Sequence, residues 1–374
     1  MSRFRFIAVA AALVGVFALA LAACGGDDDS GGSGSGGGGS SSSGGGGGGS
    51  IALLLPESKT ARYESQDRPN FEKKVKELCS GCDIIYSNAD QDASKQQQQA
   101  EAAITKGAKV LVLDPVDAAS AGAIVNRAKQ SKIPVISYDR LITDADVDYY
   151  ISFDNEKVGK LQGDALVKKL KDDGKSGSIV MINGAPTDNN AKLFKQGAHS
   201  VIDSSGFKVA KEYDTPDWSP DKAQSEMEQA ITALGKSGFV GVYAANDGTA
   251  GGAIAAMKGN GVDPTKIPST GQDAELAGIQ RILAGEQYMT VYKAIKPEAE
   301  QAAELAVALA KGDTPPAAKA KVDNGSKQVA SILLQPVAVT VDNIKDTIVK
   351  DQFWSVKEIC TGKYAAACKK AGIQ

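Results

Sequence analysis

Alternation of strand-like and helix-like segments constrains the fold of this chain more than any other feature. Short apolar runs with strand character, such as 51–55 and 109–113, are followed by stretches with helical periodicity, such as 71–78 and 119–130. Strands that are apolar along their whole length are typical of a parallel sheet covered by helices on both faces. The pattern therefore predicts an α/β fold.

The alternation restarts after residue 177. Further strand-like runs are expected at 178–182, 207–210, 239–243 and 267–270, with helical segments between them. Two blocks, "VLVLDPVDAASAGAIVNRAKQSKIPVISYDR" and "VGVYAANDGTAGGAIAAMKGNGVDPTKIPSTGQD", follow the same order: strand, acidic turn, Ala/Gly-rich helix, Ile-Pro strand and a polar pair. We therefore expect two α/β lobes of similar design, with a ligand site outside the carboxyl ends of their strands.

Polar and aromatic residues follow most of the expected strands. Asp139-Arg140 and Gln272-Asp273 end the two echoing blocks and are expected to face one cleft from opposite lobes. Any single Asp or Asn after a strand can equally serve as an N-cap of the next helix, and it is the recurrence at most strand ends that favours a site. The remaining candidates are Arg62-Tyr63, Asp188-Asn189-Asn190, Trp218, Asn246-Asp247 and Lys293.

This mixture of side chains suits a ligand rich in hydroxyl groups. Carboxylate, amide and guanidinium groups can each bind two neighbouring hydroxyls, and charge-assisted hydrogen bonds are the stronger kind. A ring such as Trp218 or Tyr63 can stack on the C–H face of a sugar. Neither a metal nor a cofactor is expected. The series Asp144, Asp146, Asp148 lacks the 12-residue loop pattern of a calcium site, so a solvated turn is the expectation there.

The N-terminal sequence predicts export. Arg3 and Arg5 precede an apolar run over 7–22, and Leu21-Ala22-Ala23-Cys24 resembles a lipobox, which makes 1–24 a lipoprotein signal peptide with Cys24 as the lipidated residue. The alternative is an ordinary membrane anchor with an incidental Cys. The Gly/Ser-rich segment 25–50 is expected to be a flexible linker with a reach of roughly 28 Å. We therefore expect an extracytoplasmic protein that contacts the membrane only through its lipid anchor.

Four further cysteines form two close pairs. For an exported protein, local disulfides within each pair are the simplest expectation. The spacing Cys-Ser-Gly-Cys is also that of a redox motif, but here it ends an amphipathic helix, whereas a reactive thiolate is favoured at a helix N-terminus. The only histidine, His199, is expected on the surface of a helix. The paired cysteines are Cys79 with Cys82 and Cys360 with Cys368.

Several function classes are disfavoured. A net charge of −3 without a basic block argues against nucleic acid as a partner. A Rossmann dehydrogenase would need Gly-x-Gly-x-x-Gly directly after a strand, which the segment 248–252 does not provide. A glycosidase could in principle use Asp139 and Asp273, but Arg140 should keep Asp139 ionised and a poor general acid. We expect a protein that is not an enzyme.

Long motifs carry a resemblance to a known family. "YDRLITDADVDYYISFDNEKVG", "PTDNNAKLFKQG", "ANDGTAGGAI", "GQDAELAGIQRI" and "MTVYKAI" closely resemble the sugar-binding proteins of bacterial ABC transporters, in the ribose/galactose-type cluster B of the type I periplasmic binding proteins. The resemblance runs from about residue 51 to residue 351. It implies two Rossmann-like lobes with parallel sheets, joined by a three-strand hinge and closing on a pyranose sugar, with D-xylose as the first expectation.

The resemblance also implies lobes, ligands and partners. The first lobe would comprise 51–154 and 293–335, the second 155–292 and 336–352, and 353–374 would be an extension without a counterpart. The partners implied are a monosaccharide and a transporter permease, with the protein as a monomer; a sensor role with a receptor kinase or chemoreceptor, and binding of glucose, arabinose or galactose, stay open. The family usually has Arg-Trp where this chain has Arg62-Tyr63. The implied ligand-binding residues are Arg62, Tyr63, Asp139, Arg140, Asp188, Asn190, Trp218, Asn246, Asp273 and Lys293.

Overall fold

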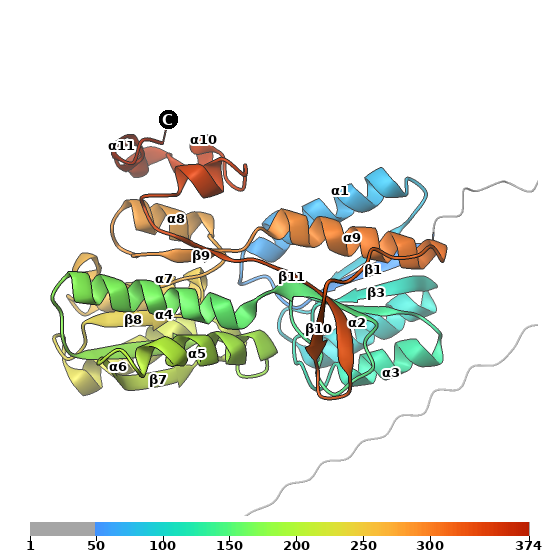
Figure 1. Cartoon of the computed structure of the whole chain (residues 1–374), viewed down its shortest axis with the longest axis horizontal. Coiled ribbons are helices and arrows are strands. Elements are labelled where there is room, and N and C mark those ends of the chain that lie inside the picture. Colours follow the sequence, from blue (N-terminus) through green and yellow to red (C-terminus); the bar gives the residue numbers. More distant parts are fainter. Residues whose placement is uncertain (1–48, 374) are drawn as a thin grey trace, which may run out of the picture. The chain divides into compact units, whose positions relative to one another are not determined.

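The computed structural model describes residues 49–373 (Figure 1). The predicted signal peptide 1–24, with Cys24, and all but the last two residues of the predicted linker lie outside the described residues. The first lobe is built on a seven-stranded sheet of order β10-β11-β5-β4-β3-β1-β2, in which only β10 runs antiparallel to its neighbour. Its strands are β1 (Ser50–Leu55), β2 (Ile84–Asn88), β3 (Ala108–Leu113), β4 (Val135–Tyr138), β5 (Tyr149–Phe153), β10 (Ala320–Asp323) and β11 (Gln328–Leu334).

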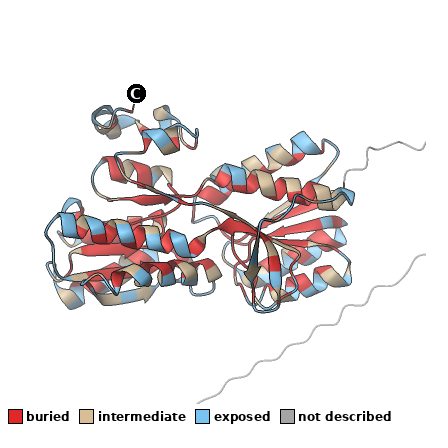
Figure 2. Ribbon diagram, viewed as in Figure 1, coloured by how far each residue is buried: buried red, intermediate tan, exposed pale blue. Residues whose placement is uncertain are grey.

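Helices cover both faces of this sheet. Side chains of β1 alternate between two apolar clusters: Ala52 and Leu54 pack on the side of α2 and α3, and Ile51, Leu53 and Leu55 pack on the side of α1 and α9. This is the two-residue period of a strand buried on both faces. Figure 2 shows the central strands β1, β3, β4 and β5 mostly buried, the edge strands β2 and β10 partly exposed, and the helices buried on one side. The helices are α1 (Arg68–Leu78), α2 (Ala93–Thr105), α3 (Gly122–Gln130) and α9 (Ile295–Lys311), and a short helical turn η1 (Tyr63–Asp67) precedes α1.

The second lobe contains a three-stranded parallel sheet of order β7-β6-β8 and an antiparallel pair, β9 with β12. Three crossings join the lobes, after β5, β9 and β11. The strands are β6 (Ser178–Asn183), β7 (Lys208–Asp214), β8 (Gly241–Ala244), β9 (Thr290–Tyr292) and β12 (Val337–Val339). The helices are α4 (Asn155–Asp172), α5 (Asn189–Ile202), α6 (Pro220–Leu234), α7 (Asp247–Gly259) and α8 (Leu276–Leu283), with short turns η2 (Pro216–Trp218) and η3 (Pro264–Lys266).

The C-terminal residues form short helices beside α8. These are a turn η4 (Lys345–Val349), α10 (Val356–Ile359), a turn η5 (Gly362–Tyr364) and α11 (Ala365–Lys370). Both expected cysteine pairs are disulfide-bonded, Cys79 with Cys82 at the end of α1 and Cys360 with Cys368 between α10 and α11.

One local expectation was wrong, and one buried side chain was not anticipated. Segment 267–270 is not a regular strand and pairs with β8 only through an isolated bridge between Val242 and Ser269, since Pro268 has no backbone N–H to donate. The run of four glutamines is not uniformly solvated. Gln97 and Gln98 are exposed, but Gln96 is buried, where it donates to the Asp114 carbonyl and accepts from the Val116 amide.

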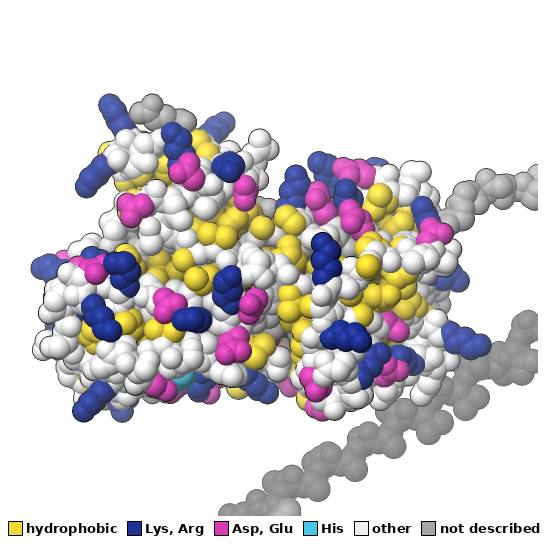
Figure 3. Space-filling view, in the orientation of Figure 1, with side chains coloured by type: hydrophobic (Ala, Val, Ile, Leu, Met, Phe, Trp, Pro, Cys, Tyr) yellow, Lys and Arg dark blue, Asp and Glu magenta, His cyan; other side chains and the backbone are white. Residues whose placement is uncertain are grey.

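Two surface features agree with what the sequence predicted. His199 lies on α5, where its ring nitrogens contact Asp203 and Glu212. Asp146 pairs with Lys129 and Lys327 at the surface. The face in Figure 3 carries Lys, Arg, Asp and Glu side chains interspersed. Between residues 49 and 373, no helix combines the length and apolar character needed to cross a bilayer.

Candidate functional site

Loops that follow the parallel strands of both lobes enclose one cavity of about 260 Å³. All ten residues implied as ligands by the family resemblance line it, and three further residues, Thr60, Phe194 and Gln272, do so as well. The ten are Arg62, Tyr63, Asp139 and Arg140 from the first lobe, Asp188, Asn190, Trp218, Asn246 and Asp273 from the second, and Lys293 at the crossing after β9.

Asp139 lies at the centre of the charged groups. It follows β4 in a left-handed backbone conformation (φ 53°) that its amide fixes by donating to the Ile151 carbonyl at 2.8 Å. Its carboxylate accepts from Arg62 Nη1 and from the Tyr63 hydroxyl, both at 3.3 Å. Burial alone would raise the pKa of Asp139, but Arg62, Lys293 and Arg140 outweigh it and hold that pKa well below the usual range.

Arg62 is held by carboxylates behind the cavity. Its Nε and Nη2 donate to the two oxygens of Asp67 at 2.9 and 2.6 Å, and Nη2 also donates to Glu298 at 3.0 Å. The Tyr138 hydroxyl donates to Asp67 as well. Burial alone would lower the pKa of Arg62, but Asp139, Asp67 and Glu298 keep it above its ordinary value. Arg62 is therefore a charged and rigidly oriented donor, because a bidentate contact fixes the guanidinium plane.

Arg140 is fixed in a similar way. Its Nε lies 3.0 Å from Asp188 and 3.6 Å from Asp114, and its Nη1 donates to the Pro115 carbonyl. Burial raises the pKa of Asp114 well above its usual value against the effect of Arg140. The contact between Arg140 and Asp188 joins the two lobes across the cavity.

On the second lobe, Asp188 caps α5 and fixes a tryptophan. Its Oδ1 accepts from the Asn190 amide at 2.8 Å, and its Oδ2 accepts from Trp218 Nε1 at 3.1 Å. Trp218 lies edge-on to Phe194, with ring centroids 6.3 Å apart. A Cβ at Gly184 would lie 2.0 Å from Trp218 Cη2, so only glycine leaves room for the indole. Asp188 therefore both caps α5 and lines the cavity.

Two asparagines at helix N-termini also line the cavity. Asn190 donates from Nδ2 to the Asp139 carbonyl at 2.9 Å, which is another contact between the lobes. Asn246 caps α7, with its Oδ1 accepting from the Thr249 amide, and still lines the cavity. Its remaining amide hydrogens are donors available on the cavity side of α7.

Asp273 and Lys293 stand opposite Asp139. Lys293 Nζ lies 3.1 Å from Asp273 Oδ1 and 3.5 Å from Asp139 Oδ1. Burial alone would lower the pKa of Lys293, but these two carboxylates raise it. Asp273 Oδ1 is buried without a hydrogen-bond partner of good geometry. A buried acceptor of this kind favours a ligand that donates a hydrogen bond.

The lining residues balance in charge. Three are cationic (Arg62, Arg140, Lys293) and three carry carboxyl groups (Asp139, Asp188, Asp273). A lining that alternates fixed donors with fixed acceptors, and has no excess of one sign, suits a neutral ligand whose groups both donate and accept. Hydroxyl groups do so.

The sequence did not identify several residues of the site. Phe194 could have been found, since it lies four residues after Asn190 and therefore on the same face of α5. Gln272 was recognised as polar at a strand end but was not assigned to the ligand set. Glu298 carries no such signal, because it reaches Arg62 from α9, far along the chain, and Asp67, five residues after Arg62, does not stand at a strand end.

These observations define a two-lobed α/β binding protein with a polar cavity between the lobes. The chain belongs to the periplasmic binding protein family: the model of the periplasmic binding protein domain matches residues 51–314. It is thus an extracytoplasmic binding protein and not an enzyme.

Individual relatives are similar over most of their length. The D-xylose-binding periplasmic protein of Escherichia coli (strain K12) is 42% identical over 313 residues, which cover 83% of this chain and 92% of the relative. The multiple sugar-binding periplasmic receptor ChvE of Rhizobium radiobacter is 35% identical, with 83% and 92% covered. A crystal structure of an ABC transporter solute binding protein from Clostridium phytofermentans with bound β-D-glucose has a TM-score of 0.75 and 30% identity, covering 83% of this chain and 99% of that one.

Proposed function

We propose that this protein is the sugar-binding component of an ABC transporter and that it captures a monosaccharide, D-xylose, outside the cytoplasmic membrane. The observation that carries the proposal is the cavity itself. It gathers charge-balanced Asp, Arg and Lys groups with the rings of Tyr63, Phe194 and Trp218 in a volume of about 260 Å³. Hydroxyls would bind the charged groups, and a ring face would lie against an aromatic side chain.

D-Xylose is proposed because of the similarity to the D-xylose-binding relative at 42% identity. The ten lining residues named above are proposed as its ligands. Asp139, Arg140 and Arg62 would bind hydroxyls from the first lobe, and Asp188, Asn190, Asn246 and Asp273 from the second. Lys293 would bridge the two sets, and Tyr63 and Trp218 would contact the faces of the sugar ring.

Capture would proceed by hinge closure. Several hydrogen bonds already join the lobes around the cavity, among them Ala118 N to the Thr187 carbonyl at 3.0 Å and Gln91 Nε2 to the Asp217 carbonyl at 3.3 Å. A sugar that binds both lobes would shift the population from open to closed forms. The permease would then recognise the closed form and receive the sugar.

Isothermal titration calorimetry with purified protein tests the ligand. D-Xylose, D-glucose, L-arabinose and D-galactose would be compared under identical conditions, with an acyclic polyol as a control that cannot present a ring face. We expect D-xylose to bind most tightly. If no monosaccharide binds, the proposal fails; if another sugar binds more tightly, the sugar class stands and D-xylose is replaced.

A sensor role is the second candidate, since the relative from Rhizobium radiobacter is a multiple sugar-binding receptor. In that case the closed form would dock on a chemoreceptor or histidine kinase. Deletion of the gene separates the two roles. Loss of sugar uptake supports transport, whereas intact uptake with loss of a sugar-induced response supports sensing.

We further propose that Cys24 carries the lipid anchor. In the native host, Cys24→Ser should move the protein from the membrane pellet to the soluble fraction. Cys79→Ser is a matched control in the folded domain and should leave the protein in the pellet. A Cys24→Ser protein that stays with the membrane contradicts the anchor.

A further inference from the structure

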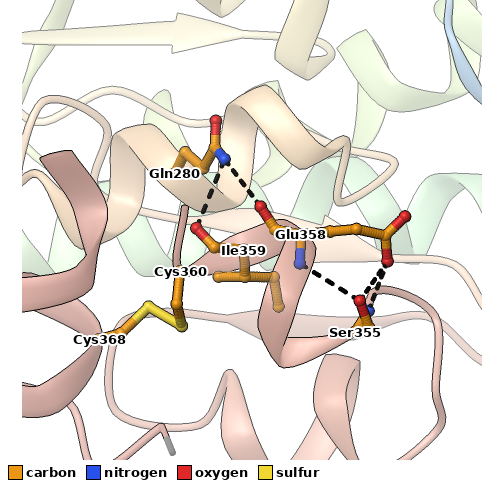
Figure 4. The surroundings of a disulfide bond; sticks show 6 residues. All are labelled: Gln280, Ser355, Glu358, Ile359, Cys360 and Cys368. Carbon is orange, nitrogen blue, oxygen red and sulfur yellow. Dashed lines mark hydrogen bonds between the residues drawn. A yellow bond between two sulfur atoms is a disulfide. The ribbon is translucent and has the colours of Figure 1, made fainter. Parts of the chain in front are cut away.

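The C-terminal segment Phe353–Ile373, here named the C-terminal clip, contains a helix cap and a disulfide that hold its short helices together. Ser355 begins α10 with a reciprocal capping box, in which its side chain accepts from the Glu358 amide and the Glu358 carboxylate accepts from the Ser355 amide. The Cys360–Cys368 disulfide joins the end of α10 to α11 (Figure 4). These features limit the conformations that the clip can adopt.

The clip is attached to α8, the helix that starts just after Asp273. Gln280 Nε2 donates to the carbonyls of Glu358 and Ile359 at 3.2 and 3.4 Å, as Figure 4 shows. Ile359 and Cys368 also belong to the apolar cluster that contains the buried side of α8. Movement of the clip is thereby coupled to movement of α8.

Trp354 reaches the backbone beside Asp273. Its Nε1 donates to the Ala274 carbonyl at 2.8 Å. Asp273 and Ala274 both have left-handed backbone conformations, with φ of 84° and 48°. Such a conformation is costly for alanine and persists only where the surroundings impose it.

Three hydrogen bonds impose this conformation. The Asp273 amide donates to the Val291 carbonyl at 2.9 Å, and the Ala274 amide donates to Thr290 Oγ1 at 3.2 Å. Both partners belong to β9. The third bond is the one from Trp354, and it alone comes from the clip. Trp354 thus holds the peptide group that follows Ala274, one residue after Asp273.

Phe353 connects the clip to the other lobe. Gln66 Nε2, in the turn η1 that begins with Tyr63, donates to the Phe353 carbonyl at 3.2 Å. The Phe353 ring lies edge-on to Tyr292, with centroids 5.1 Å apart, and Tyr292 precedes Lys293. The dipeptide Phe353-Trp354 therefore contacts neighbours of lining residues from both lobes.

We propose that Phe353-Trp354 is a positioning element of the binding site: Trp354 orients Asp273 towards the ligand, and the Phe353 carbonyl latches the first lobe through Gln66 in the closed form. The proposal rests on the proposed function in that it takes a sugar as the ligand. Neither residue touches the cavity, so both act through others.

Trp354→Phe tests the orienting role, because it removes the indole N–H and keeps an aromatic ring. With the sugar that the wild type binds, we expect the Kd to rise about tenfold, the loss of about one hydrogen bond. Tyr364→Phe is the matched control: it alters another aromatic residue of the clip, and its Kd should equal that of the wild type. Urea unfolding verifies that each variant is folded.

A double-mutant cycle distinguishes positioning from general support. If Trp354 acts through Asp273, Trp354→Phe should have little effect on the Kd in an Asp273→Asn background and its full effect in an Asn246→Ala background. An equal effect in both backgrounds, or an unchanged Kd in the single variant, overturns the orienting role. If the wild-type protein binds no monosaccharide, the proposed function fails, and this inference fails with it.

Gln66→Met tests the latch, since methionine keeps the length of the side chain and cannot donate. Under this proposal the bond forms only in the closed form, so we expect the dissociation rate of the sugar to rise roughly threefold to tenfold and the association rate to stay the same. Gln98→Met, at an exposed position of α2, is the control. Stopped-flow displacement measures both rates. A Gln66→Met protein with the dissociation rate of the wild type overturns the latch.

Discussion

At the scale of single residues, the site is an arrangement of charges that fix one another. Asp139 contacts Arg62 and Lys293, and Lys293 in turn contacts Asp273. Each of these groups is buried, so none would be stable without its partners. The ligand can therefore meet polar groups that are already oriented, which lowers the entropic cost of binding.

Asp139→Asn removes the central charge of this arrangement. We expect sugar affinity to fall by about 2–3 kcal/mol, as for the loss of hydrogen bonds to a charged group, and calorimetry measures it. The carboxylate also stabilises the fold: because its pKa lies below the unfolded value, its contribution is present above about pH 4 and is lost as the pH falls further. Asp146→Asn removes a carboxylate from a surface ion pair and should leave affinity unchanged; an equal loss in both variants contradicts the role of Asp139.

Gly184→Ala tests the position of Trp218. The added Cβ would lie within 2.0 Å of the indole, so the ring must move and its hydrogen bond to Asp188 must weaken. We expect stability to fall by about 1–3 kcal/mol and sugar affinity to fall with it. Gly259→Ala is the control, since a Cβ there meets no atom within 4 Å. Unchanged affinity in Gly184→Ala would show that the ring does not contact the ligand.

At the scale of elements, residues that directly precede helices supply part of the site and part of the contact between the lobes. Asp188 precedes α5, Asn246 precedes α7 and Glu275 precedes α8. Glu275 Oε1 also accepts from the Ala61 amide of the first lobe at 3.4 Å. Burial, with the nearby carboxyl groups of Asp247 and Asp273, raises the pKa of Glu275 to about 8, although Arg281 opposes this.

Glu275→Gln should change how stability depends on pH. The folded-state pKa of Glu275 is raised, so its contribution is fully present below about pH 4 and is lost as the pH rises towards about 8. Urea unfolding from pH 5 to pH 9 should show the variant gaining stability relative to the wild type as the pH rises. Glu286→Gln, at a surface pair with Lys258, provides the control. Parallel pH curves for wild type and Glu275→Gln would mean that Glu275 is already ionised at neutral pH.

At the scale of the whole molecule, the proposed function depends on an equilibrium between open and closed arrangements of the lobes. The bonds between them are few and polar, such as Asn190 Nδ2 to the Asp139 carbonyl and Thr187 Oγ1 to the Val116 carbonyl. A ligand that contacts both lobes adds to these bonds only in the closed form and so shifts the population towards it.

Small-angle scattering tests this shift. With a sugar that calorimetry shows to bind, we expect the radius of gyration of the chain without its leader to fall on saturation. An acyclic polyol that does not bind should leave it unchanged. If the bound and free proteins give the same radius of gyration, the lobes are closed in both states and capture must proceed through another opening.

The repeated α/β pattern and the strand-end polar residues could be predicted because each depends on local chemistry. Apolar runs fix β1, β3 and β6 within two residues, and Asp139 follows β4 as its sequence position required, whereas Asp273 follows a segment that only forms isolated bridges. Segment 267–270 was wrongly expected to be a strand although Pro268, a local signal against a regular ladder, was visible in the sequence. The buried role of Gln96 was set by the loop at Asp114 and not by the glutamine run.

The sequence by itself determined which groups would stand at the ends of the strands, because strand periodicity and chain direction decide where a residue points. Only the tertiary structure decided which of these groups meet. Glu298 orients Arg62, and Trp354 binds beside Asp273, across separations of many residues that no local pattern encodes. The physical reason is that a buried charge requires partners, and packing of the whole chain supplies them.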